Sequence, residues 1–211
     1  MRYTGDHKQK THERIVAEAS RLFREEGYKG ASVDAVMEAA ELTPGGFYAH
    51  FDDKDALFAE VLEACILRKN RRLAADAELT DESFREWVEY YLGRDHLDEP
   101  GNSCPLTSLT EEVARQPKKV RKVFTDTIRI RLAEIARAAP GATAAERSEN
   151  GITALASLMG AIMLARAVTD ADLSDQILHA VRKSIFARAE QPAEAKPRVA
   201  ARKSIAAKRD A

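Results

Sequence analysis

The chain of 211 residues carries a formal net charge of −1, with 32% charged and 6% aromatic residues. This composition favours an all-α protein of one or two domains and excludes a strongly basic nucleic-acid-binding protein. Residues 1–60 hold eight Lys and Arg against twelve Asp and Glu, whereas residues 188–211 hold seven against three. Any contact of the first segment with nucleic acid must therefore come from a few local groups.

The first helix is expected over residues 8–27. Ile15, Leu22 and Phe23 recur on one helical face, and Gly27 supplies the stop at its C-terminal end.

Two short helices and a longer one follow. Ser32 is expected to cap a helix over residues 33–40, and Thr43 to cap another that has Pro44 in its first position and ends near His50. A further helix is predicted from Lys54 to about residue 72. Three short helices, the last two joined by a tight turn, predict a helix-turn-helix unit. Glu41 occupies the turn position that usually holds glycine.

The sequence "GGFYAH" places two glycines inside the third helix, although each costs about 1 kcal/mol relative to alanine. On an α-helical wheel with Phe47 facing the core, Thr43 lies on the same side as Phe47, Gly45 and Ala49 point outward, and Gly46 and Tyr48 lie on the flanks. The outward face is therefore nearly bare except for one tyrosine. Such a face lets the backbone approach another surface closely, and in a helix-turn-helix that surface is the DNA major groove.

Neighbouring polar residues fit a contact with the DNA backbone. Tyr48 can donate to a phosphate, His50 can reach the backbone, and Lys54 places a cation at a helix start, where the dipole disfavours it unless an anion is present. Ser32 and Thr43 can cap helices and still offer hydroxyl or amide groups to phosphates. The alternative is structural: a surface tyrosine, a histidine packed on the next aromatic ring, and a solvated lysine.

The remaining chain is predicted to be helical over residues 81–97, from Pro105 to near "RQP", and over 118–138, 144–168 and 173–188. Asp81 or Ser83 is expected to cap the first of these helices, and "DEPGNS" after it is expected to be a loop. The tail from 189 to 211 is rich in Ala, Lys, Arg and Pro, and we expect it to be disordered and basic. This organisation predicts domains at 1–54 and 55–188, followed by that tail.

No apolar run reaches the roughly 18 residues that cross a bilayer, and the N-terminus lacks an apolar signal-peptide core, so we expect a cytoplasmic protein without a membrane partner. Cys65 and Cys104 lie far apart without metal-ligand spacing, so neither a metal site nor another cofactor is predicted. Catalytic side chains do not occur at useful spacing, which speaks against an enzyme.

Residues 11–62 resemble the DNA-binding domain of TetR-family transcriptional repressors, through "LF…GY.G.S" at the end of the first helix and the block "FY.HF..K..L". The resemblance implies a homodimer of all-helical subunits that binds an operator in double-stranded DNA. It also implies a C-terminal domain that binds a small-molecule effector and dimerises through its last two helices. The family's DNA contacts carry over to Ser32, Thr43, Gly45, Gly46, Tyr48, His50 and Lys54.

The sequence of the second domain, residues 55–188, says less about which residues bind the effector. Apolar and aromatic residues that could line a family-type pocket, but that could equally be plain core, are Trp87, Tyr90, Tyr91, Cys104, Leu106, Phe124, Ile128, Met159 and Met163. Cys104 precedes Pro105 and is expected to be an N-cap. It could be a thiol of lowered pKa that senses oxidants, or simply a small, half-buried residue at a tight helix entry, which we favour. The "CPL" motif resembles a feature of one TetR subgroup.

The apolar stretch 151–168, together with 173–188, is expected to pack on a second copy across a two-fold axis. The sequence thus predicts a ligand-responsive regulator, a repressor released from a palindromic operator by its effector. An enzyme and a helical module that binds proteins instead of DNA are the alternatives.

Overall fold

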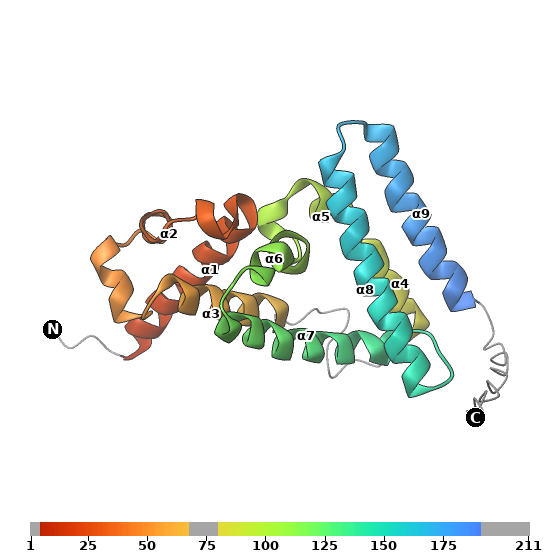
Figure 1. The fold of residues 1–211 in the computed structure, drawn as a ribbon, viewed down its shortest axis with the longest axis horizontal. Helices are drawn as coiled ribbons and strands as arrows, with labels where there is room; N and C mark the ends of the chain where they lie inside the picture. The colour runs from red at the N-terminus through yellow and green to blue at the C-terminus, as the bar shows by residue number, and fades with distance from the viewer. Residues whose placement is uncertain (1–4, 68–79, 191–211) are drawn as a thin grey trace, which may run out of the picture.

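The computed structural model describes residues 5–67 and 80–190, and every regular element in these two ranges is a helix (Figure 1). The N-terminal elements are α1 (Gly5–Gly30), α2 (Val33–Ala39), the 3₁₀ helix η1 (Pro44–Ala49) and α3 (Lys54–Leu67). The later elements are α4 (Asp81–Tyr91), α5 (Arg94–Asp98), the 3₁₀ helix η3 (Pro100–Asn102), α6 (Pro105–Ala114), α7 (Lys118–Ala138), α8 (Ala144–Ala167) and α9 (Ala171–Glu190).

The helices form an elongated arrangement with α1, α2, η1 and α3 at one end and the antiparallel pair α8 and α9 at the other (Figure 1). Helix α7 runs between the two ends, packing on α3 near its start and on α8 near its finish. Helix α6 packs against α1. The end that carries η1 is thus joined to the rest of the chain mainly through α1 and α3.

Aromatic side chains fill the core of the N-terminal end. Phe23 of α1 meets Phe58 of α3 edge to face, with ring centroids 5.1 Å apart, and both are fully buried. Phe47 of η1 is also fully buried and stacks on Phe51, at 5.5 Å between centroids. The buried pair of Phe47 and Phe51 holds the short helix η1 in place, although η1 is too short to be stable alone.

The predicted end of the first helix is confirmed at Gly27. Its backbone has φ 75° and ψ 172°, which breaks the helix before one last turn leads to Gly30. A positive φ of this size suits glycine and is strained for other residues, so Gly27 is required by the bend.

The predicted helix over 81–97 is instead two helices, because the chain breaks at Leu92 and Gly93 before α5 begins. Its cap also differs from the prediction. Thr80, rather than Asp81 or Ser83, is the N-cap, and Thr80 and Ser83 form a reciprocal capping box. The turn at 100–102 is a short 3₁₀ helix rather than a plain loop.

Helix α8 is long and apolar enough, by length and composition, to cross a bilayer, which the sequence analysis did not anticipate. Core helices pass the same test, and α8 packs between α7 and α9. At Gly151, a Cβ atom would lie 3.4 Å from the backbone of Ala136, so glycine allows α7 and α8 to approach closely. Ile152, Met163 and Leu164 remain exposed on α8.

Two of the predictions extend past the described residues. The continuation of the fourth predicted helix beyond Leu67 and the basic tail from residue 191 lie outside them. The tail was expected from residue 189, whereas α9 continues to Glu190. The predicted boundary at residue 54 coincides with the first residue of α3.

Candidate nucleic-acid interface

A tight turn after α2 sets the direction of η1. The amide of Leu42 donates to the carbonyl of Met37 at 2.8 Å, and that of Glu41 donates to Glu38 at 2.9 Å. These two bonds form a Schellman motif, whose penultimate residue is normally glycine in the left-handed conformation. Glu41 takes that place with φ 56°. The turn therefore has the geometry of a glycine turn, at a cost of about 1–2 kcal/mol for the side chain.

The segment from Pro44 to Ala49 is a 3₁₀ helix rather than the α-helix that the sequence predicted. A 3₁₀ helix has three residues per turn, so side chains three apart lie on the same edge. Gly45 and Tyr48 therefore share one edge, while Phe47 points into the core. The side chain of Tyr48 is 74% exposed. A Cβ atom at Gly45 would meet nothing within 4 Å, so this edge is open around the tyrosine.

Two of the predicted contact residues lie differently from the wheel prediction. Gly46 faces inward, because a Cβ atom there would sit 3.5 Å from the Cε atom of Met37. Thr43, which the wheel placed on the same side as Phe47, is exposed. It holds the N-cap position of η1, with Pro44 next, but its side chain makes no capping hydrogen bond. The change from 3.6 to 3.0 residues per turn moves Thr43 from about 40° to about 120° away from Phe47, which accounts for its exposure. It does not account for Gly46, which lies against Met37 because η1 packs on α2.

Ser32 is the N-cap of α2 as predicted, and its hydroxyl oxygen accepts a hydrogen bond from the amide of Ala35 at 3.0 Å. The start of α3 is capped by Asp53, whose carboxylate accepts from the amide of Ala56 at 2.7 Å. A carboxylate already occupies this helix start, so the free amide groups expected there for a phosphate are partly used.

Lys54 is held against the protein rather than extended into solvent. Its ammonium group donates to the carbonyl of Tyr28 and lies 4.5 Å from the centre of the Tyr28 ring. Burial lowers the pKa of Lys54, against the opposing effect of Asp55 and Glu112. The Tyr28 hydroxyl in turn donates to Asp55, and burial together with this carboxylate raises the tyrosine pKa. Lys54 still has further N–H donors for a phosphate.

His50 ends η1 and sits against a second histidine that the sequence analysis did not assign. The ring of His12 stacks on Phe51 at 4.7 Å, lies 5.7 Å from the ring of His50, and bonds Glu60 at 2.5 Å. The Nδ1 atom of His50 is buried and has no hydrogen-bond partner among the described residues. Burial lowers the pKa of His50, and His12 and Lys8 add to the effect, so the ring is neutral near pH 7.

The helical pattern of α1 places His12 on an apolar face, but its stacking partner Phe51 lies 39 positions later in the sequence. His12 lies on the same side of α1 as Ile15 and Ala19, both of which are fully buried. Only the fold reveals that Phe51 and Glu60 meet that side.

The nine residues predicted for a ligand pocket do not share one environment. Trp87, Tyr91 and Leu106 are buried; Cys104, Phe124, Ile128 and Met159 are partly buried; Tyr90 and Met163 are 39% and 44% exposed. Trp87 and Tyr91 are one turn apart and share the inner face of α4, whereas Tyr90 points away from it. Tyr90 and Met163 are therefore open to solvent in this chain, and a ligand contact for any of the nine residues stays a prediction.

Cys104 is the N-cap of α6, as predicted, but its thiol is not activated. Burial raises its pKa, and the lowering effects of Tyr91, Arg131 and the backbone amides of α6 do not reverse this. The Tyr91 pKa is likewise raised, mainly by burial and then by Cys104. The structure thus agrees with the half-buried, packing role that the sequence analysis favoured for Cys104.

A partly buried arginine closes the other side of this region. The guanidinium group of Arg166 donates to the carbonyls of His96 and Leu97 and lies 3.4 Å from the Ser108 hydroxyl. It therefore ties α8 to α5 and α6. Burial, with the nearby Arg166 cation, lowers the pKa of His96 to about 4.

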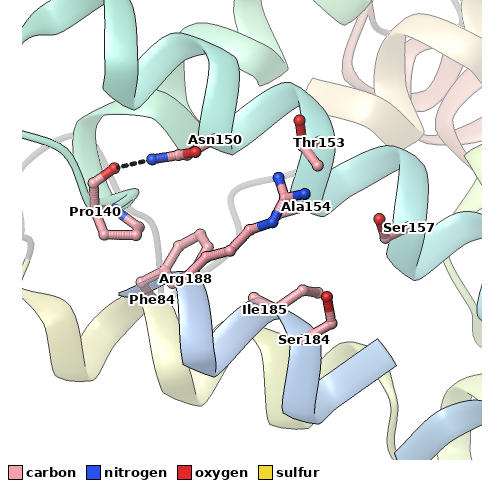
Figure 2. A pocket seen from close by; sticks show the side chains of 9 residues that line it. All are labelled: Phe84, Pro140, Asn150, Thr153, Ala154, Ser157, Ser184, Ile185 and Arg188. Carbon is pink, nitrogen blue, oxygen red and sulfur yellow. Dashed lines mark hydrogen bonds between the residues drawn. The ribbon is translucent and has the colours of Figure 1, made fainter. Parts of the chain in front are cut away.

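A separate pocket lies at the far end of the chain, between α4, α8, α9 and the connection from α7 to α8 (Figure 2). Its volume is about 380 Å³, counting its open mouth. None of the nine predicted ligand residues lines it.

Residues 15–61 match the model of the family described as bacterial regulatory proteins, tetR family. The HTH-type transcriptional regulator UidR from Escherichia coli (strain K12) is 31% identical over 121 residues, which are 57% of this chain and 54% of UidR. The HTH-type transcriptional regulator AcrR from Shigella flexneri is 39% identical over 62 residues, 29% of each chain. This chain therefore spans about half the length of UidR, and less of AcrR.

Solved structures agree in fold over most of the chain. E. coli NemR in its reduced form gives a TM-score of 0.67 at 18% identity, covering 82% of this chain and 96% of NemR. A TetR-family regulator from Cytophaga hutchinsonii gives 0.68 at 19% identity, covering 84% and 94%. These likenesses show the fold: an N-terminal helix-turn-helix domain followed by a helical domain. Together the comparisons show a segment of the tetR type at the N-terminus of a TetR-like fold, and the two relatives are named as HTH-type transcriptional regulators. The finer subgroup marked by "CPL" stays a prediction.

Proposed function

We propose that this chain, whose N-terminal segment is of the TetR type, is a homodimeric transcriptional repressor. It binds a near-palindromic operator in double-stranded DNA and is released when a small-molecule effector binds its C-terminal helices. We place the protein in the cytoplasm.

The open edge of η1 carries this proposal. Phe47 anchors the helix in the core, while Gly45 and Tyr48 form an edge with one exposed aromatic ring and empty space beside it. A surface tyrosine that only met water would need neither the adjacent glycine nor the strained turn at Glu41. An edge that admits nucleotides explains all three.

Groups around this edge supply contacts to the sugar–phosphate backbone. Thr43 and Ser32 stand at the starts of η1 and α2, where backbone amides face outward. His50 is neutral and acts as a hydrogen-bond donor, and Lys54 contributes a positive charge. The first 60 residues are acidic overall, so these few groups must provide the attraction, and we expect modest affinity for non-specific DNA.

The exposed apolar face of α8 supports a dimer. Ile152, Met163 and Leu164 are exposed there, and Leu173 is exposed on α9. A second copy packed on this face would bury it and place two η1 helices about 34–36 Å apart in successive major grooves in the simple case. An effector would then act by binding more tightly to a dimer in which this spacing is wrong.

The test is fluorescence anisotropy with labelled DNA from the region upstream of the protein's own gene, compared with a scrambled sequence. A repressor should bind the upstream fragment more tightly, and its affinity should fall steeply between about 50 and 200 mM salt. If neither DNA is bound even at low salt, the proposal fails. A chain that instead binds a protein with little salt dependence would be the helical interaction module.

A further inference from the structure

We propose that the pocket between α4, α8 and α9 (Figure 2) binds a small molecule that carries a carboxylate on an apolar body. The site is distinct from the edge of η1 and from the nine residues predicted for the ligand. Binding at this site stands by itself, whereas its role as the effector site rests on the proposed function.

The pocket is rich in hydrogen-bond donors and holds no acidic side chain among its lining residues. Arg188 reaches from α9 across the space toward α8, and the hydroxyl groups of Thr153, Ser157 and Ser184 surround it (Figure 2). Within the described residues, no ion pair or hydrogen bond engages the Arg188 guanidinium group. A planar guanidinium group that faces a pocket without a carboxylate partner is suited to receive one from a ligand.

The three hydroxyl groups behave differently from others in the helices of this domain. Thr110, Thr125 and Thr127 each donate to the carbonyl four residues earlier, at 2.7–2.8 Å. In the described part of the chain, the hydroxyls of Thr153, Ser157 and Ser184 have no such bond. Their donors therefore stay available on the pocket side, where an anion could accept them.

The rest of the wall is apolar and fixed. Phe84 and Ile185 are buried and line the pocket, and Asn150 is held in place by donating to the carbonyl of Pro140 at 2.8 Å. The open space of about 380 Å³ includes solvent at the pocket mouth, so the enclosed part admits only a small ligand. A purely inorganic anion would leave this apolar wall unused, which favours a carboxylate attached to a small ring or short chain.

The structure also provides a reporter. Trp87 is the only tryptophan of the sequence, and its ring lies 5.6 Å from that of Phe84, measured between centroids. A ligand that contacts Phe84 should therefore alter the fluorescence of Trp87, without any DNA in the experiment.

The experiment titrates the full-length, DNA-free protein with sodium benzoate, following Trp87 fluorescence and heat release, with benzamide as the neutral isostere. We expect saturable benzoate binding, no binding of benzamide, and at least about a tenfold loss of affinity in Arg188→Gln. Thr153→Val should weaken binding by a smaller factor. Lys183→Gln removes an exposed positive charge from the same helix outside the pocket and should bind like the unaltered protein.

Several results would overturn the inference: equal binding of benzamide, equal loss in Lys183→Gln, or no saturable binding of benzoate to a protein that melts normally. Inorganic phosphate binding as tightly as benzoate would overturn the apolar part of the ligand class. DNA anisotropy on the same samples separates the two proposals. If the protein binds DNA but not benzoate, only the proposed pocket is refuted. If it binds benzoate but not DNA, only the proposed repressor function is refuted.

Discussion

The ammonium group of Lys54 donates to the backbone carbonyl of Tyr28, which joins the first residue of α3 to the end of α1. The cation that the sequence assigned to a phosphate thus has a structural partner in the DNA-free protein. Because an ammonium group has three donors, one bond to Tyr28 leaves others for DNA, and it fixes where they point.

Lys54→Met should therefore affect both folding and binding. The Tyr28 carbonyl loses its charged donor, so the free energy of unfolding should fall by about 1–2 kcal/mol. If Lys54 also neutralises one phosphate, the slope of log affinity against log salt should become shallower by about 0.9 per contact. Urea unfolding measures the first effect and anisotropy at several salt concentrations the second. An unchanged salt slope would confine Lys54 to its structural role.

Tyr48→Phe removes one hydroxyl group from an exposed ring and should leave stability within about 0.5 kcal/mol of the unaltered protein. If the hydroxyl donates to a phosphate, operator affinity should fall about tenfold, because a bond to a charged group is worth about 1.5–3 kcal/mol. Tyr90→Phe, on the exposed face of α4, is the matched control and should bind normally. Equal affinity for both variants would show that the Tyr48 hydroxyl does not touch DNA.

His96 should make the fold sensitive to acid. Its pKa is about 4 in the fold and about 6.5 when unfolded, so the unfolded chain binds more protons below pH 6.5. The stability contributed by the neutral ring is therefore complete above pH 6.5 and is lost as the pH falls toward 4, by at most about 3 kcal/mol.

Urea unfolding at pH 7.5 and pH 5 checks this expectation for His96. In His96→Gln the difference between the two pH values should shrink, whereas His179→Gln, which changes an exposed histidine of α9, should retain it. Identical pH dependence in all three proteins would contradict the burial argument.

Cys104 should react slowly with iodoacetamide at pH 7.5, because burial raises its pKa and limits access. In a Cys65→Ser background, which leaves a single thiol, alkylation of the folded protein should be at least about tenfold slower than in urea. Rapid modification of the native protein, followed by loss of DNA binding, would restore the sensor interpretation of this residue.

Most of the helical arrangement could be predicted because strong local signals coincide with the observed ends. Gly27 stops α1, Ser32 caps α2 and Pro44 opens η1, and each acts through its own backbone or side chain. The break at Gly93 was missed because apolar periodicity continues through it. The 3₁₀ form of η1 was missed because six residues cannot distinguish periods of 3.0 and 3.6.

The site was predictable only in part, for a physical reason. Phe47 inward and Tyr48 outward follow from local pattern, and the structure agrees with both. The partners of Lys54 and His50 come from α1, which is distant in sequence, so no local pattern could reveal them. The ligand residues were chosen by apolarity, which does not distinguish an exposed Met163 from a buried Leu106.

Operator affinity of Gly45→Leu, measured beside its melting temperature, decides whether nucleotides enter the open edge of η1. A Cβ atom at Gly45 meets nothing within 4 Å in the free protein, so the fold should tolerate leucine, with a melting temperature close to that of the unaltered chain. The account predicts that this folded protein loses operator binding by at least about a hundredfold, because the side chain fills the space that nucleotides need. Operator binding as tight as that of the unaltered protein, in an equally stable Gly45→Leu variant, would contradict it.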